Sequence, residues 1–170
     1  MTAPPAQAQP VTHYENFPVA SWLCPPAIRP AVAALYHFAR TADDIADEGT
    51  QTASQRLQEL DRYGNALTLA AGSTPYPADA SWSGIMQPLQ GVIRQYQLPV
   101  PLLQDLLTAF RRDIHHSEQA AVYARHDDLL DYVRYSANPV GRLMLHLYGV
   151  HDAESLQQSD AICTALQLYN

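Results

Sequence analysis

An all-α fold is predicted by three observations on this sequence. Apolar residues recur at helical spacing in every segment with a clear pattern, no window shows the sustained alternation typical of a strand, and no internal repeat is visible. The chain has 170 residues, 47% of them hydrophobic, which is enough to bury one core. We therefore expect a single domain of packed helices.

The first long helix is predicted over residues 29–48. Pro30 suits its first turn, where the N–H that proline lacks has no partner within the helix. A strongly apolar run follows from Ala31 to Ala39, and Gly49 is expected to end the helix. Upstream, residues 13–20 are expected to form a short helix or turn.

A second amphipathic helix is predicted over residues 54–71, with Ser54 as its N-cap. Its apolar residues at helical spacing are Leu57, Leu60, Tyr63, Leu67 and Ala70. This face is expected to pack on the apolar face of the first helix. Residues 72–80 combine Ser, Pro and Gly and are predicted to form a loop.

A third helix is predicted over residues 81–97, with Pro88 near its start or at a kink. The fourth begins at Pro99 or Pro101 and is expected to end at about Ile114. Its predicted core residues are Leu102, Leu103, Leu106, Leu107 and Phe110, and its predicted outward residues are Asp105, Arg112 and Asp113. Residues 117–125 are expected to be a loop.

A fifth helix is predicted over residues 127–148 and a sixth from 152 to 170. Pro139 and Gly141 interrupt the fifth, and in a regular helix this proline would remove a hydrogen bond to the carbonyl of Tyr135, costing about 3 kcal/mol or more. We expect a kinked helix with a carbonyl available to a ligand. The alternative is that the helix ends and restarts there.

Charge and cysteine content exclude several classes of function. The net charge is -7, lysine is absent, and Arg111-Arg112 is the largest cluster of cations, so no nucleic-acid partner is expected. Cys24 and Cys163 have no metal-ligand spacing and are expected to be buried thiols in a reducing compartment. No run approaches the ~20 apolar residues that span a bilayer.

The end of the first helix carries a row of ionisable side chains. A period of 3.6 residues places Tyr36, Arg40, Asp43 and Asp47 on one stripe, with Asp44 and Glu48 beyond it. The neighbouring apolar stripe consists of Leu35, Phe38, Ala42 and Ile45. Carboxylates at this end oppose the helix dipole by roughly 0.3–1 kcal/mol each, so a cation is expected nearby. The carboxylates could bind a metal or form a solvated helix end, and Arg40 could pair with Asp43 or Asp44.

The motifs occur in a recognisable order. They are His13 three residues before Asn16-Phe17, Arg-x-x-Asp-Asp-x-x-Asp from Arg40 to Asp47, the Val140-Gly141 step and the closing Leu-Gln-Leu-x-Asn of residues 166–170. This order resembles the squalene and phytoene synthase family, which implies a terpenoid-synthase-like helical bundle acting on prenyl diphosphates. The residues at these motifs are most similar to those of the hopanoid-pathway branch of the family, whose members convert presqualene diphosphate to hydroxysqualene.

The resemblance implies roles for individual residues. Asp43 and Asp47 would be catalytic carboxylates that hold Mg²⁺, which prefers one or two carboxylates together with substrate phosphates. Arg40 and His13 would contact the diphosphate. The other implied site residues are the cavity-lining Tyr36 and Tyr132 and, before a second aspartate-rich motif, Gln167 and Asn170.

That second motif is absent, because the sequence stops at Asn170. We therefore expect residues 13–170 to be the N-terminal part of one isoprenoid-synthase domain without its C-terminal helices. Residues 1–12 are expected to be a disordered tail because the N-terminus is rich in Pro, Ala and Gln. The chain would be a fragment of a longer enzyme or a truncated, inactive product. The resemblance also implies a bacterial cytoplasmic location, with peripheral membrane association for an apolar product.

Two other functions remain open from the sequence. A phytoene or dehydrosqualene synthase would catalyse the first head-to-head condensation instead. A noncatalytic helical module would bind a prenyl lipid or a partner protein through a groove left by the missing helices.

Overall fold

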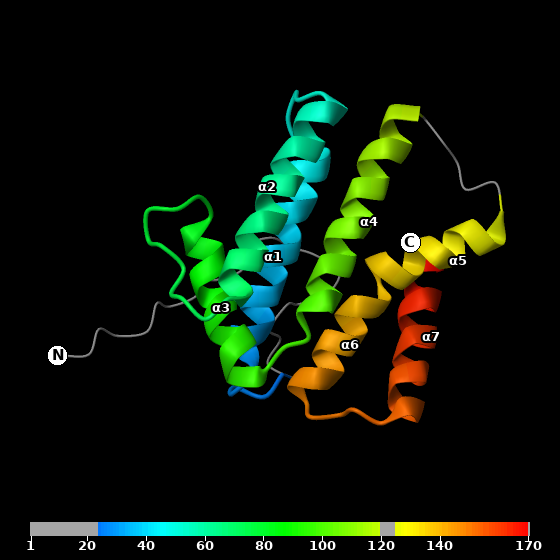
Figure 1. The fold of residues 1–170 in the computed structure, drawn as a ribbon. Helices are drawn as coiled ribbons and strands as arrows, with labels where there is room; N and C mark the ends of the chain where they lie inside the picture. The colour runs from blue at the N-terminus through cyan, green and yellow to red at the C-terminus, as the bar shows by residue number, and fades with distance from the viewer. Residues whose placement is uncertain (1–23, 120–124, 170) are drawn as a thin grey trace.

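The computed structural model describes residues 24–119 and 125–169, and all regular secondary structure within them is helical (Figure 1). These residues form α1 (Arg29–Asp47), α2 (Ala53–Ala71), α3 (Ser83–Tyr96), α4 (Val100–Gln119), α5 (His126–Ser136), α6 (Asn138–Leu147) and α7 (Ala153–Tyr169). In this part of the chain, no helix is long and apolar enough to cross a membrane. The all-α prediction is confirmed.

The long helix α4 connects the two parts of the bundle. It packs on α1 and α2 and also contacts α5 and α6, while α3 packs on α1 and α2 (Figure 1). The last helix, α7, packs on α5 and α6. The placement of α1 relative to α5 therefore depends on α4.

An aromatic cluster fixes the register of α1 on α2. Tyr63 and Phe38 are both fully buried, and their rings stack with centroids 5.2 Å apart. The Tyr63 hydroxyl donates a 3.1 Å hydrogen bond to the Phe38 carbonyl, and Trp82 meets the Tyr63 ring edge-on at 5.1 Å. This confirms that the apolar face predicted for the second helix packs on that of the first.

The start of α2 differs from the prediction. Its N-cap is Thr52, not Ser54, and Thr52 forms a capping box with Gln55. The Thr52 side chain accepts from the Gln55 backbone N–H at 3.3 Å, and the Gln55 side chain accepts from the Thr52 N–H at 2.9 Å. The reciprocal pair satisfies two N–H groups, which favours Thr52 over a single capping bond from Ser54.

Helix α4 is longer than predicted. It continues five residues beyond Ile114 to Gln119, so the loop predicted over 117–125 is wrong for residues 117–119. The segment is polar but contains neither glycine nor proline, and polarity alone does not end a helix.

The predicted kinked helix is in fact two helices. α5 ends at Ser136, Ala137 is the intervening residue, and α6 begins at Asn138 with Pro139 in its first turn. At that position the proline needs no N–H partner. The prediction of a continuous, kinked helix was wrong, and the alternative of an end and a restart is correct.

Helices α6 and α7 approach closely at Gly141. A Cβ atom built on this glycine would lie 2.6 Å from Cys163 Sγ and would also clash with Ser159 Oγ. Polar contacts flank this crossing: Arg142 forms a two-pronged pair with Asp160 at 2.9 and 2.6 Å, and Thr164 donates to Asn138 at 3.2 Å. The glycine allows the two backbones to come close enough for these bonds.

Candidate functional site

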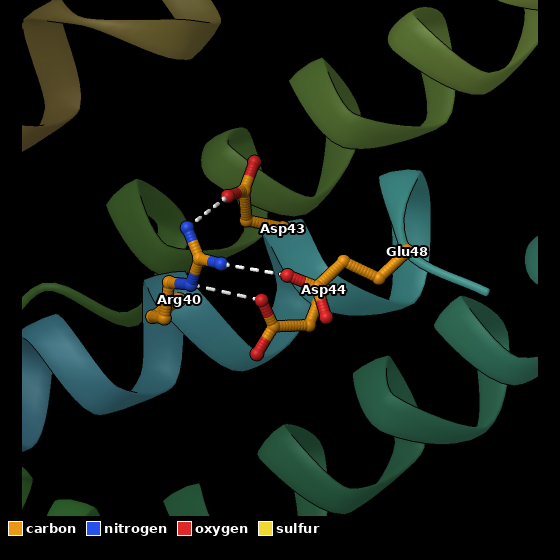
Figure 2. Close-up of polar contacts among 4 residues, drawn as sticks. All are labelled: Arg40, Asp43, Asp44 and Glu48. Atoms are coloured by element: carbon orange, nitrogen blue, oxygen red, sulfur yellow. Dashed lines mark hydrogen bonds and ion pairs between the residues drawn. The ribbon is translucent and has the colours of Figure 1, made fainter. Parts of the chain in front are cut away.

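Arg40 lies at the centre of the acidic end of α1 (Figure 2). Its Nη1 donates to Asp43 Oδ2 at 3.2 Å and its Nη2 to Glu48 Oε1 at 2.9 Å, while Nε forms an ion pair with Asp44 Oδ1 at 2.8 Å. The open alternative that Arg40 pairs with Asp43 or Asp44 is confirmed for both. Asp44 and Glu48 are therefore partners of the same guanidinium and do not lie apart from the predicted stripe.

A second cation stabilises this end of α1. Arg56, in the first turn of α2, donates from Nη1 to the Ala46 carbonyl and from Nη2 to the Gly49 carbonyl at 3.0 Å. The Ala46 carbonyl belongs to the last turn of α1, the negative end of the helix dipole, where a cation is favourable, and the Gly49 carbonyl lies just beyond it. The cation expected from the sequence is thus present twice, as Arg40 and as Arg56. Gly49 has φ +86°, which agrees with its predicted role in ending the helix.

Asp43 and Asp47 differ in exposure. Asp43 is half-buried and pairs with Arg40, whereas Asp47 is exposed as the last residue of α1. Tyr36 precedes Arg40 by one turn, is half-buried and meets the His37 ring edge-on at 5.6 Å. The predicted stripe of Tyr36, Arg40, Asp43 and Asp47 thus follows one side of α1, becoming more exposed toward its end.

The sequence analysis missed a further carboxylate, Asp113. It was predicted to point outward with Asp105 and Arg112, but all three are partly buried against neighbouring helices. Burial raises the pKa of the Asp113 carboxyl, the Tyr132 hydrogen bond and His116 oppose that rise, and Asp43 and Asp47 add to it by repulsion. Asp113 therefore brings the negative charge of α4 toward the acidic end of α1.

Tyr132 is brought to the same region from α5. Its hydroxyl donates a 3.0 Å hydrogen bond to Asp113 Oδ2. The structure thus joins α1, α4 and α5 around Arg40, Asp43, Asp47, Asp113 and Tyr132. Gln167 is partly buried on α7, while His13 and Asn170 lie outside the described residues, so their predicted roles stay predictions.

The donor set agrees with Mg²⁺ in type but supplies few ligands. Both predicted ligands, Asp43 and Asp47, offer carboxylate oxygens, which are the donors that Mg²⁺ prefers. Within the described ranges, however, no group of three or more His, Cys, Asp or Glu side chains is arranged to hold a metal. The two carboxylates fit an ion that is also held by phosphate oxygens and water.

The pKa of Asp113 predicts a pH effect on stability. Because its pKa is raised in the folded state, the folded chain binds this proton more tightly, and the stability contributed by the group falls as pH rises from 3.8 through the folded value. Asp113→Asn removes the titration, so as the pH rises above about 4 the variant should gain stability relative to the wild type. Urea unfolding midpoints across this range would measure the difference, and a difference that moves in favour of the wild type would contradict it.

Comparisons with known proteins point to one family. A family model described as squalene/phytoene synthase matches residues 11–170. Proteins named hydroxysqualene synthase from Rhodopseudomonas palustris and Zymomonas mobilis are 39% and 40% identical, with 92% of this chain and 49% and 48% of theirs covered. A presqualene diphosphate synthase from Rhodopseudomonas palustris is 28% identical over 99% of this chain and 57% of its own.

A solved structure shares the fold. The crystal structure of squalene synthase HpnC from Alicyclobacillus acidocaldarius superposes with a TM-score of 0.75 at 39% identity, covering 91% of this chain and 54% of that one. The chain spans about half the length of the curated relatives it matches. Since the family model covers nearly the whole sequence, the chain belongs to the squalene/phytoene synthase family.

Proposed function

We propose that this chain provides the first aspartate-rich half of a site that ionises presqualene diphosphate to yield hydroxysqualene. The observation that carries the proposal is the cluster in which Arg40 is held by Asp43, Asp44 and Glu48, next to the exposed Asp47. The choice of reaction is supported by 39–40% identity to hydroxysqualene synthases, against 28% to a presqualene diphosphate synthase.

The proposed roles follow from charge and exposure. Asp43 and Asp47 would hold Mg²⁺, which when bound would neutralise charge on the leaving diphosphate. Arg40 presents a guanidinium that can exchange a carboxylate partner for a diphosphate oxygen, because both accept its hydrogen bonds with similar geometry. Tyr36 and Tyr132 would line the apolar space that shelters the cation left on the prenyl chain until water adds to it.

The test asks whether Mn²⁺ binding depends on the Asp43–Asp47 pair and not on other surface carboxylates. In Asp43→Asn/Asp47→Asn, the affinity for Mn²⁺ in the presence of inorganic pyrophosphate should fall about 100-fold, or about 2.8 kcal/mol, because both carboxylate ligands are lost. Electron paramagnetic resonance of free Mn²⁺ would measure this.

The matched control is Asp79→Asn, an exposed carboxylate in the 72–80 loop, which should leave the affinity unchanged. Undiminished binding by the double variant would refute the site assignment. A substrate comparison would separate the two reactions. Conversion of presqualene diphosphate would support the proposed reaction, whereas condensation of two simpler prenyl diphosphates would indicate a phytoene or dehydrosqualene synthase.

One observation favours a second candidate function. Helix α7 carries three exposed apolar side chains, Ile162 (60% exposed), Leu166 (46%) and Tyr169 (92%). Spacings of four and three residues place them on one stripe of the helix. An exposed apolar stripe of this kind is typical of a surface that contacts a lipid or a partner protein. Prenyl-alcohol binding that survives Asp43→Asn/Asp47→Asn in a chain without turnover would support this alternative, whereas Mg²⁺-dependent turnover would exclude it.

A further inference from the structure

Helix α7 turns its more polar side toward the rest of the bundle. It lies at the edge of the bundle and packs on α5 and α6 (Figure 1). Its half-buried side chains recur at helical spacing and are Ser155, Leu156, Ser159, Asp160, Cys163, Thr164 and Gln167. Among them are Asp160 and Thr164, which bond to Arg142 and Asn138 of α6. Most of this side is polar, so α7 presents mainly polar groups to its neighbours.

The opposite side of α7 is apolar over its second half. From residue 161 to residue 169, every exposed side chain is apolar apart from the Tyr169 hydroxyl. These side chains form the outer α7 face, which consists of Ala161, Ile162, Ala165, Leu166, Leu168 and Tyr169. A surface helix of a globular protein has the reverse arrangement, with its apolar residues toward the core and its polar residues toward water. The pattern of α7 is therefore that of a helix covered on both sides.

The charges of α7 favour a protein over a membrane surface as the neighbour on this face. Helices that lie in a membrane interface are typically rich in Lys and Arg on their polar side. Residues 153–169 contain neither Lys nor Arg, and their charged side chains are the acidic Glu154 and Asp160. The helix thus lacks the cations that would draw it to an anionic lipid surface.

The comparisons indicate which protein surface this is. The chain covers 54% of the solved squalene synthase structure and 48–49% of the hydroxysqualene synthases. The family fold therefore includes a further part, similar in size to this chain, that has no counterpart in the matched residues. Within the described residues, four of the seven exposed large apolar side chains lie on α7. This concentration makes the outer α7 face the main apolar contact that those residues offer to the remaining part.

We propose that the outer α7 face is the docking surface for the remaining helices of the squalene/phytoene synthase fold. Those helices cover Ile162, Leu166 and Tyr169, so that α7 becomes a central helix between two layers. The occupant is a helical polypeptide with a complementary apolar face. The proposal concerns assembly of the domain and holds for any reaction that the site catalyses, so its failure would leave the proposed function intact.

A chimera tests this docking surface. The unmatched part of the hydroxysqualene synthase that is 40% identical would be joined after Asn170, where the family resemblance places the second aspartate-rich motif. Hydrogen exchange of the α7 amides should be about 100-fold slower in the chimera than in the 170-residue chain alone, because α7 then opens only when the new contact breaks. Ile162→Gln/Leu166→Gln should remove most of this slowing and leave exchange in the chain alone unchanged. Glutamine favours a helix about as well as leucine does, so the loss would report the contact and not the helix.

The matched control is Leu69→Gln in α2. Leu69 is 44% exposed and Leu166 is 46% exposed, so the same substitution is made at the same accessibility. Leu166→Gln alone should speed α7 exchange in the chimera about tenfold, whereas Leu69→Gln should leave it unchanged. Equal effects of the two single substitutions would overturn the proposal.

Two further results would also overturn it. One is equal α7 exchange in the chimera and in the chain alone, because then either nothing docks on the outer α7 face or the chain alone already covers it. The other is a dimer of the chain alone, or its binding to phosphatidylcholine vesicles, that Ile162→Gln/Leu166→Gln abolishes, because a second copy or a lipid would then occupy the face. Sedimentation of the chain with and without vesicles would detect both.

Discussion

Replacing Tyr63 with alanine is expected to lower the free energy of unfolding by about 3–5 kcal/mol. The side chain is fully buried, stacks on Phe38, meets Trp82 edge-on and donates a hydrogen bond to the Phe38 carbonyl. Truncation would leave a cavity between α1, α2 and α3, whose surrounding rings can collapse only in part. Urea unfolding followed by far-ultraviolet circular dichroism would measure the loss.

Two further substitutions separate the contributions to this loss. Tyr63→Phe removes only the hydroxyl and should cost about 1 kcal/mol. Tyr169→Ala, at a tyrosine that is 92% exposed on α7, should change stability by less than about 0.5 kcal/mol. If Tyr63→Ala and Tyr169→Ala had similar effects, the aromatic cluster would not anchor the α1–α2 interface.

The second large effect is expected at Gly141, where alanine should destabilise the chain by about 1–3 kcal/mol. Its Cβ would clash with Ser159 and Cys163, so α7 would have to move away from α6 and strain the Arg142–Asp160 pair. Thermal unfolding of the variant would show the decrease.

Gly91→Ala is the matched control because Gly91 lies inside α3, and a Cβ there meets no atom within 4 Å. This substitution should stabilise the chain by about 0.5–1 kcal/mol through lower entropy of the unfolded state. Adding Ser159→Ala and Cys163→Ala to Gly141→Ala should restore most of the lost stability. A gain in stability from Gly141→Ala alone would contradict the close approach of the two helices.

Features set by local periodicity could be predicted from the sequence. The predicted apolar stripe of α1 has Phe38 and Ala42 fully buried, because a helix has a fixed period and one face must meet the core. The same period placed Arg40 and Asp43 on one side of α1. The family motifs added the expected roles, which geometry alone does not assign.

Features that depend on contacts between helices could not be predicted in this way. Asp113 was expected to point outward because charged side chains usually do, but α5 and the end of α1 face it. Arg56 stabilises α1 from α2, and nothing in its own helix indicates that role. Thr52 was the exception, since Gln55 three residues later is a recognisable capping signal that was overlooked.

The way in which α7 is attached has a consequence for how its release can be detected. No residue of α7 is buried, and its contacts with α6 include the Arg142–Asp160 pair, the Thr164–Asn138 bond and the close approach at Gly141. Detaching this helix would expose little further surface of its own side chains, so any change in heat capacity or denaturant slope would report chiefly the faces of α5 and α6 that it covers. High ionic strength would favour this local opening, because it screens the Arg142–Asp160 pair.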